Sequence, residues 1–337
     1  MNVRVLSKNL IHAPAFRAVI LFIIVVLVLA IGQPATLGNF GIVLSSVVDV
    51  WLVALALTPL LILGEIDLSV GATMAVAAGV TVQSSDNLLF GIAIAISTGL
   101  VIGLINGLLV VKVGINSFVT TLGMMIALQG LALAITGGEP IPVENTAAAL
   151  AFSNPILAGI TPDILVAISI TLFLLYFISN MRSGRDLFAI GSNPDAAMAA
   201  GIPVARRKIL SFVLCSAFSA VAGAVITLNL VAASPILGST VMLMAIAAAV
   251  IGGGRLSGGR GSILGSAIGA VAIGGINVGL QMAGFDTTVV DIIVGSILFL
   301  AIVFTKDIKK ILRLPSISFR GKNVSLQPST EGVINHV

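Results

Sequence analysis

The chain has few charged residues, one cysteine and two histidines, and each shortage excludes a class of protein. Charged residues make up 9% of its 337 residues, whereas soluble domains usually carry about 25%. Cys215 stands alone, which excludes an intrachain disulfide and a multi-cysteine metal site. His12 and His336 lie near the two ends, which argues against histidine ligands or bases. We therefore expect no catalytic, metal or cofactor site in this chain.

Apolar residues and glycine fill the composition instead. Hydrophobic residues account for 58% of the chain, glycine for 36 residues, and the mean hydropathy is +1.19. A water-soluble core cannot absorb this much apolar surface, and abundant glycine is typical of membrane helices that pack closely. The composition predicts an all-α polytopic membrane protein.

Ten stretches of the sequence approach the roughly 20 apolar residues that a helix needs to cross the hydrocarbon. Basic residues precede the first stretch, which lacks a convincing cleavage site, so we interpret it as an uncleaved signal anchor. The third and eighth stretches are short enough to be tilted, broken or re-entrant. The predicted spans are 16–33, 40–63, 67–83, 88–111, 117–136, 162–180, 209–232, 238–253, 261–283 and 289–305.

The distribution of positive charge supports this arrangement through the positive-inside rule. With a cytosolic N-terminus, all 17 Lys and Arg residues fall on the cytosolic side, whereas the external segments carry only acids. We predict cytosolic N- and C-termini, with an N-terminal segment 1–15, a permease domain 16–305 and a tail 306–337. This one-sided charge also explains the isoelectric point near 9.6, so nucleic acid is not an expected partner.

A weak internal repeat relates the two halves of the chain. The segment around Asn106 in the fourth span resembles the segment around Asn277 in the ninth, and each is followed by a glycine, Gly114 or Gly284. Five spans separate the copies, and an odd number inverts the second copy in the membrane. Inverted repeats commonly enclose a substrate path. We predict two inverted five-helix repeats.

Two carboxylates lie between the second and third spans, in the segment GEIDLSVG. Acids at a membrane are costly and tend to line a path or to pair with a partner, so Glu65 and Asp67 are candidates for a substrate or gating role. Alternatively, Asp67 caps the third helix by accepting backbone N–H groups. Asp49, deep in the second span, is a further acid whose position is harder to explain.

Polar residues also open the fifth span, in the segment INSFVTTLG. They could face a pore, although a plain N-cap by Asn116 or Ser117 explains part of the pattern. The predicted pathway residues are Glu65, Asp67, Asn106, Asn116, Phe118, Thr121 and Asn277.

The cytosolic segment 181–208 is the longest charged interruption inside the apolar sequence. Ser192 or Asn193 can cap a short helix that starts at Pro194 and that Gly201 ends. A firmly capped two-turn helix between basic flanks suits the groove of another protein. The residues predicted to couple this segment to an ATPase are Ile190, Gly191, Asn193, Pro194, Asp195, Ala196, Ala197, Gly201 and Ile202.

The string LSGGRG at 256–261 resembles a motif of ABC ATPases, but the chain is not predicted to hydrolyse ATP. It contains no GxxxxGK[ST] phosphate loop, and the string lies between two membrane spans. We interpret it as a glycine turn with two cytosolic arginines, Arg255 and Arg260.

Four ordered segments resemble the permeases of sugar-importing ABC transporters, the group for ribose, xylose, arabinose and galactosides that also includes autoinducer-2 permeases. They are GEIDLSVG, GLINGLLVVKVGINSFVTTLG, GRDLFAIGSNPDAAMAAGIPV and AIAAAVIGGGRLSGGRGSILG, and the resemblance extends over residues 40–305. It implies a dimer of ten-helix permeases, homodimeric or heterodimeric, in the lipid of the bacterial inner membrane. It also implies cytosolic ATPase subunits that bind ATP and magnesium, a periplasmic or lipoprotein substrate-binding protein, and docking of 187–203 on the ATPase.

Two departures from the family pattern leave the solute open. Glu65 replaces a usual glycine, and Met242-Leu243-Met244 replaces a usual Glu-Leu-Asp. Our interpretation is a transport subunit, not an enzyme, that moves a monosaccharide or a related solute inward by alternating access. The alternatives are a branched-chain amino acid permease, an ion-coupled secondary transporter that uses Asp49, Glu65 and Asp67, and a passive channel.

Overall fold

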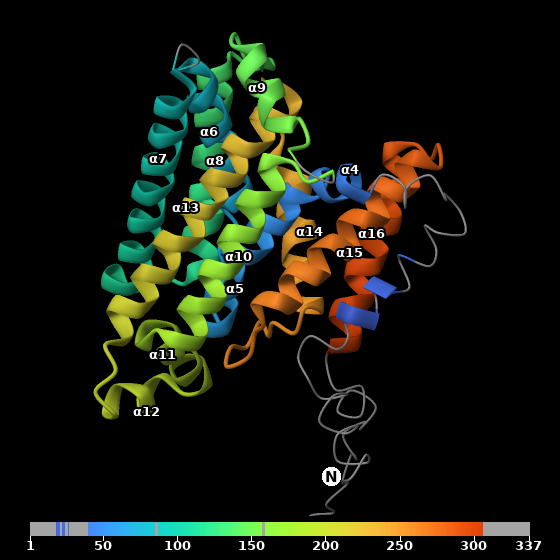
Figure 1. Ribbon diagram of the computed structural model, residues 1–337. Coiled ribbons are helices and arrows are strands. Elements are labelled where there is room, and N and C mark those ends of the chain that lie inside the picture. The colour runs from blue at the N-terminus through green and yellow to red at the C-terminus, as the bar shows by residue number, and fades with distance from the viewer. Residues whose placement is uncertain are drawn as a thin grey trace, which may run out of the picture.

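The computed structural model describes residues 18–20, 22–23, 26, 40–84, 87–156 and 159–305, which form a bundle of helices (Figure 1). Five helices are long and apolar enough to cross a membrane. They are α7 (Leu88–Leu108, extended by the π-helical turn η2, Leu109–Val113), α8 (Ser117–Thr136), α10 (Pro162–Asn180), α13 (Val204–Leu230) and α15 (Ile263–Met282). The prediction of an all-α polytopic membrane protein is confirmed.

Shorter apolar helices occupy the remaining described spans. They are α5 (Val48–Leu63), preceded by α4 (Phe40–Ser45), α6 (Val70–Gln83) and α14 (Gly238–Ile251). The last described helix is α16 (Thr287–Thr305), with 19 residues. Apart from a few helical positions, the predicted first span 16–33 lies outside the described residues, as do the segments 1–15 and 306–337.

Helix α5 forms the centre of the bundle. Every residue from Val48 to Leu63 except Asp49 is buried, and α10, α11, α13, α14 and α15 all pack against it. A helix that is apolar on all sides and enclosed by others needs no amphipathic stripe. The start of this helix explains Asp49, whose position was hard to explain from the sequence. The predicted span 40–63 breaks at Ser46–Val47, and Asp49 therefore lies in the first turn of α5, where a negative charge complements the helix dipole.

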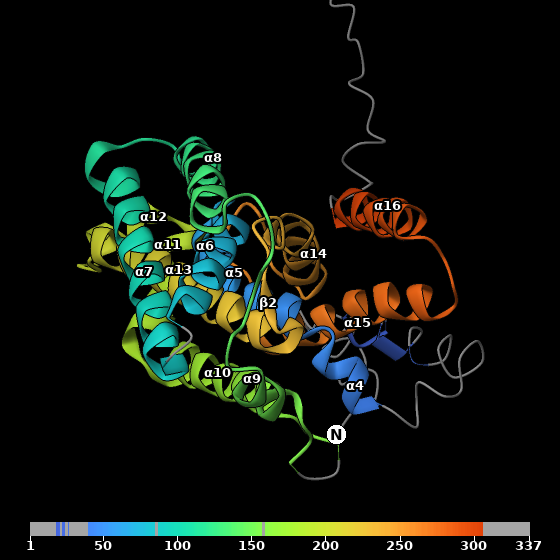
Figure 2. The ribbon, with the colours of Figure 1, turned by 90° about the horizontal axis from the view of Figure 1, so that it is seen from above.

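The outer helices present apolar side chains outwards. Seen from above, α7 and α8 lie on one side of the molecule, and α15 and α16 lie on the other (Figure 2). Large residues such as Val101 on α7, Ile126 on α8 and Leu172 on α10 are more than half exposed. Exposed apolar surface along membrane-length helices is the surface expected to face lipid tails.

Glycines allow the closest helix contacts, as their four-residue spacing predicts. A Cβ atom on Gly99 or Gly103 of α7 would lie 2.6 or 2.5 Å from a backbone oxygen of α13. On the other side of the bundle, Gly265 and Gly269 of α15 lie equally close to the backbone of α14. At these contacts the backbones of the two helices approach each other directly, without side chains between them.

Short elements cover the two ends of the bundle. At one end, α9 (Thr146–Ser153) lies near a two-residue strand pair, β1 (Ile141–Pro142) with β2 (Ala232–Ala233). At the opposite end lie α11 (Arg182–Ser192) and α12 (Pro194–Ala199), as Figure 1 shows. The sequence did not predict α9, α11 or the strand pair. Helix α13 begins five residues before the predicted span 209–232, because the helix continues through the basic residues at its start.

Candidate functional site: a buried acid loop joined to a surface helix pair

The loop Gly64–Ser69 connects α5 to α6 and carries both predicted acids. Gly64 adopts φ +79°, and the N–H groups of Gly64 and Glu65 donate to the carbonyls of Leu61 and Leu60. This is the Schellman pattern, which ends a helix with a left-handed residue and favours glycine. The chain turns sharply at Gly64, and the next residues enter the space between α6, α7 and α8.

Asp67 lies at the centre of a buried polar cluster. Its side chain is fully buried, and Oδ1 accepts from the backbone N–H of Ser69 at 2.8 Å and from Ser69 Oγ at 2.6 Å. The N-cap of α6 is Ser69 and not Asp67, so the capping alternative is wrong in detail: Asp67 instead holds the turn that leads into the helix. Asn106 Nδ2 of α7 donates to Ser69 Oγ at 3.0 Å. Asp67 Oδ2 and Asn106 Oδ1 have no hydrogen-bond partner among the described residues.

Thr121 of α8 joins the loop to the same cluster from the other side. Its Oγ1 accepts from the backbone N–H of Leu68 at 3.1 Å and donates to the carbonyl of Ser117 at 2.8 Å. The structure therefore brings together three of the predicted pathway residues, Asp67, Asn106 and Thr121. Ser69 links two of them and was not predicted, although its position two residues after an aspartate is a common local hydrogen-bonding pattern.

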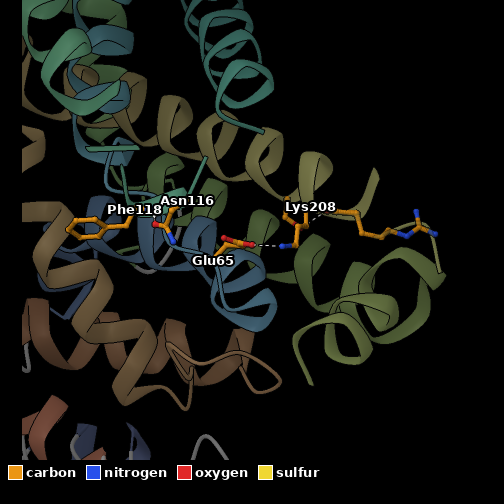
Figure 3. A network of polar contacts seen from close by, with 6 residues as sticks. Glu65, Asn116, Phe118 and Lys208 are labelled. Atoms are coloured by element: carbon orange, nitrogen blue, oxygen red, sulfur yellow. Dashed lines mark hydrogen bonds and ion pairs between the residues drawn. The ribbon is translucent and has the colours of Figure 1, made fainter. Parts of the chain in front are cut away.

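Glu65 points away from this cluster. Its carboxylate forms an ion pair with Lys208, with Nζ 2.5 Å from Oε1, and both side chains are largely covered. Figure 3 shows Glu65 directed at Lys208, with Asn116 and Phe118 on the other side of the carboxylate in that view. From the sequence alone, Lys208 was identified only as one of several cytosolic charges. Its contact with Glu65 joins residues 143 positions apart and therefore leaves no local pattern in the sequence.

The remaining predicted pathway residues lie outside the buried cluster. Asn116 is the N-cap of α8 and accepts from the N–H of Phe118 at 2.9 Å, as the capping alternative predicted. Phe118 is half exposed. Asn277 of α15 accepts from Gln281 of the same helix. The repeat-related asparagines thus differ, since Asn106 is fully buried and Asn277 is only partly buried.

Helices α11 and α12 build the predicted docking segment. Asn193 caps α12 by accepting from the N–H of Ala196 at 3.0 Å, and Pro194 occupies the first turn. Gly201 has φ +77°, and the N–H groups of Gly201 and Ile202 close a second Schellman motif. The predicted helix Pro194–Ala200 is confirmed to within one residue. Asp195 and Ala196 are exposed, whereas Ala197 and Ile190 are buried against the bundle.

Glycines hold α11 against the end of α5. A Cβ atom on Gly191 would overlap the carbonyl oxygen of Ile62 and would lie 2.7 Å from the nitrogen of Gly259. Gly259 donates its N–H to the same Ile62 carbonyl at 2.8 Å. A Cβ on Gly258 would also meet Gly64 at 3.0 Å. The docking segment, the loop Gly64–Ser69 and the LSGGRG turn therefore meet at one point, which explains that turn as a packing element.

The N-terminal ends of the short helices α6 and α14 also meet. Gly71 and Gly238 approach so closely that a Cβ atom on either would overlap the backbone of the other. A cavity of about 260 Å³ begins at the first turn of α14 and extends towards α16. Leu243 and Met244 form part of its apolar wall, and Ser239, Thr240 and Asp291 supply the polar groups.

A second buried acid lies in α10, near the end of the bundle that carries α9. Asp163 is fully buried and accepts from Ser45 Oγ of α4 at 2.5 Å and from Asn229 Nδ2 of α13 at 2.9 Å. From the sequence alone, Asp163 was identified only as an acid in an external segment. Within the described residues, no three His, Cys, Asp or Glu side chains come together as metal ligands do.

The described part of the chain combines membrane-length helices with two fully buried acids. Asp67 lies in the loop after α5, and Asp163 contacts α4, just before the start of α5. Buried acids inside a bundle of membrane helices are typical of membrane transport proteins. A family model described as branched-chain amino acid transport system, permease component, matches residues 39–302. The chain is 36% identical to the ribose import permease protein RbsC of Bacillus subtilis, over 70% of this chain and 75% of that protein. It is 33% identical to the autoinducer 2 import system permease protein LsrD of Photorhabdus laumondii, over 72% and 75%. It is 34% identical to the probable ABC transporter permease protein y4mJ of Sinorhizobium fredii, over 69% and 72%.

No solved structure matches the chain significantly. The chain belongs to this family of ABC transporter permeases. It is a transport subunit and not an enzyme, and it is a multi-pass protein of the bacterial inner membrane. Family membership implies, in general, a partner ATPase and a substrate-binding protein.

Proposed function

We propose that the chain is the membrane-spanning subunit of an ATP-driven importer that carries a monosaccharide or a related small polyol-like solute into the cytoplasm. The names of two relatives, for ribose and for autoinducer 2, support a sugar-like solute over a branched-chain amino acid. The observation that carries the ATP-driven mechanism is α12, a firmly capped helix with exposed residues at the end of the bundle. A passive channel has no need of such a helix.

The complete transporter contains cytosolic ABC ATPase subunits, a second permease protomer and a periplasmic or lipoprotein substrate-binding protein. ATP and magnesium are bound by the ATPase subunits, so the permease itself carries no cofactor. Its contacts with the ATPase are made by residues of α11, α12 and the turns beside them, from Ile190 to Ile202. The second protomer is either the same chain or a related one.

We assign ten membrane spans to the domain 16–305, with the flanking segments 1–15 and 306–337 in the cytosol. The positions of the described charges support this orientation. The basic residues lie in α11, at the start of α13, in η2 and in the turn between α14 and α15, and these segments contact one another. Glu139 and Glu144, beside the strand pair, belong to the opposite end (Figure 1). An excess of Lys and Arg on the cytosolic side is the expected bias.

Helix packing supports two inverted five-helix repeats. A shift of five spans converts α5 into α13, α6 into α14, α7 into α15 and α8 into α16. The packed pairs α6 with α7 and α14 with α15 correspond under this shift, as do α6 with α8 and α14 with α16. The pair α7 with α13 likewise corresponds to α15 with α5. The touching starts of α6 and α14, at Gly71 and Gly238, lie where a pseudo-two-fold axis would pass.

The substrate path runs beside the loop Gly64–Ser69, with Asp67, Asn106 and Thr121 as its central polar groups. Asn116, Phe118 and Asn277 contribute nearer the edges of the path, whereas Glu65 acts on it through the loop. Amide, hydroxyl and carboxylate groups are suited to sugar hydroxyls, each of which both donates and accepts hydrogen bonds. Unpaired acceptors on Asp67 and Asn106 support this assignment.

Site-directed crosslinking tests the docking of α12. Met198 is 61% exposed on α12, and Leu150 is 52% exposed on α9 at the opposite end of the bundle. A cysteine at Met198 should crosslink to the co-expressed ATPase subunit, whereas a cysteine at Leu150 should not. The native Cys215 is buried and should stay silent. Equal crosslinking at both positions, or none at Met198, would refute the proposed orientation and docking.

Uptake of labelled ribose and arabinose into cells separates ATP-driven from ion-coupled transport. We expect uptake to cease on ATP depletion and to survive an ionophore that collapses the ion gradient while ATP is maintained. The reverse result would assign Asp67 to ion coupling and refute the ATP-driven importer.

A further inference from the structure

The loop Gly64–Ser69 contacts the docking segment on one side and the polar cluster on the other. On the docking side, Glu65 accepts from Lys208 at 2.5 Å. Lys208 lies just over one turn into α13, the helix that follows α12 and the turn at Gly201. On the inner side, Leu68 and Ser69 contact Thr121 and Asn106. The five residues Glu65–Ser69 therefore connect a surface helix contact to the buried polar cluster.

Two contacts of different character join the docking segment to this loop. The glycine contact of Gly191 and Gly258 with the end of α5 is a backbone-to-backbone approach that resists compression. Such a contact transmits a push, but the approach of Gly191 to α5 resists separation only weakly through dispersion forces, and the hydrogen bond to the Ile62 carbonyl comes from Gly259, outside the docking segment. The Glu65–Lys208 pair is attractive and partly removed from water, with side chains 14% and 24% exposed. An ion pair in reduced dielectric resists separation more strongly than an exposed one.

We propose that the Glu65–Lys208 ion pair is a positioning contact that makes the loop Gly64–Ser69 follow the docking segment when the ATPase moves it. This inference rests on the proposed function, because it assumes that α12 docks on an ATPase. Glu65 and Lys208 act through the loop and do not touch the solute.

A neighbouring ion pair provides a matched control. Arg207 Nε donates to Asp186 at 2.8 Å and joins α13 to α11 within the docking segment. It has the same chemistry and similar exposure, and it lies one residue from Lys208. It does not reach the loop. Its removal therefore reports what a purely structural ion pair contributes.

The experiment follows the loop directly and needs no knowledge of the solute. Ile66 is partly buried in the loop and is replaced by cysteine, while the native Cys215 is buried. The permease is purified with its ATPase in nanodiscs, and the rate of maleimide labelling at position 66 is compared with and without ATP and vanadate. We expect nucleotide trapping to change this rate, and we expect Glu65→Gln and Lys208→Gln each to reduce the change about fivefold, as loss of one partly buried ion pair allows.

Three further measurements decide the outcome. The exchange Glu65→Lys with Lys208→Glu should restore the nucleotide response, and Asp186→Asn should leave it unchanged. The ATPase should co-purify equally with all variants. An unchanged response in Glu65→Gln and Lys208→Gln, or an equal loss in Asp186→Asn, would overturn the proposal. Failure of the unmodified chain to retain the ATPase would instead overturn the proposed function. A variant that unfolds is recognised by labelling of Cys215, and the exchange variant then decides.

Discussion

Glu65 and Asp67 are two residues apart on one loop, yet they differ in exposure and in the groups that they contact. Glu65 is partly exposed and paired with Lys208, whereas Asp67 is fully buried and is hydrogen-bonded to Ser69. An acid near water can hold its charge with one cationic partner. A fully buried acid without one depends on N–H donors and on the field of the helix start beside it. The loop thus faces the predicted docking segment with one acid and the buried polar cluster with the other.

Gly191→Ala should have the largest effect on stability, because it would force α11 away from the end of α5, where the loop Gly64–Ser69 begins. The added methyl group overlaps the Ile62 carbonyl, a rigid backbone atom at the end of α5. We expect a loss of about 3 kcal/mol in stability, at the upper end of typical overpacking costs. The buried Cys215 offers the measurement, since a thiol-reactive fluorophore labels it only on thermal unfolding.

Gly130→Ala is the matched control for this substitution. Gly130 lies within α8, and a Cβ atom there would meet no atom within 4 Å. Alanine is the better helix former by about 1 kcal/mol, so this variant should be neutral or slightly more stable. If Gly191→Ala behaved like Gly130→Ala, the contact between α11 and α5 would not hold the loop in place.

Asp67→Asn should have the next largest effect, and on transport more than on folding. Asparagine keeps an oxygen that accepts from Ser69, so the turn at the start of α6 is preserved and the expected stability change is about 1 kcal/mol or less. The charge is removed from the polar cluster. We expect ribose uptake to fall at least about tenfold, because a buried path acid is normally retained for function. Asp67→Ala should lose both stability and uptake. Unchanged uptake in Asp67→Asn would reduce Asp67 to a helix cap.

Local patterns in the sequence were sufficient for most of the membrane helices and for α12, but not for the site. The spans 117–136 and 162–180 match α8 and α10, and the cap residues of α12 were identified from Asn193, Pro194 and Gly201. These features depend on residues within one or two turns of each other. Helix α11 was missed because its buried stripe of Gly184, Leu187 and Ile190 is short and lies among charges.

Long-range contacts account for what the sequence could not show. Asp67, Asn106 and Thr121 were chosen separately, and only the fold brings them together at Leu68 and Ser69 of one loop. Nothing near Lys208 indicates Glu65 as its partner. Asp163 looked like an ordinary external acid until α4 and α13 enclosed it. Polar residues inside a membrane protein are recognisable one by one, but their grouping depends on how the helices pack.

Glu65→Gln should have the smallest effect on stability, and its salt dependence should separate the two acids. A partly exposed ion pair contributes about 1 kcal/mol or less, and salt screens it. We therefore expect the unfolding temperatures of Glu65→Gln and the unmodified protein to converge as sodium chloride is raised from 0.05 to about 1 M, where the Debye length falls to about 3 Å. The difference produced by Asp67→Asn should persist, because Asp67 is fully buried and forms no ion pair with any described residue that salt could screen. If both differences vanished in salt, Asp67 would be accessible to ions, and the contrast between an outward and a buried acid would be wrong.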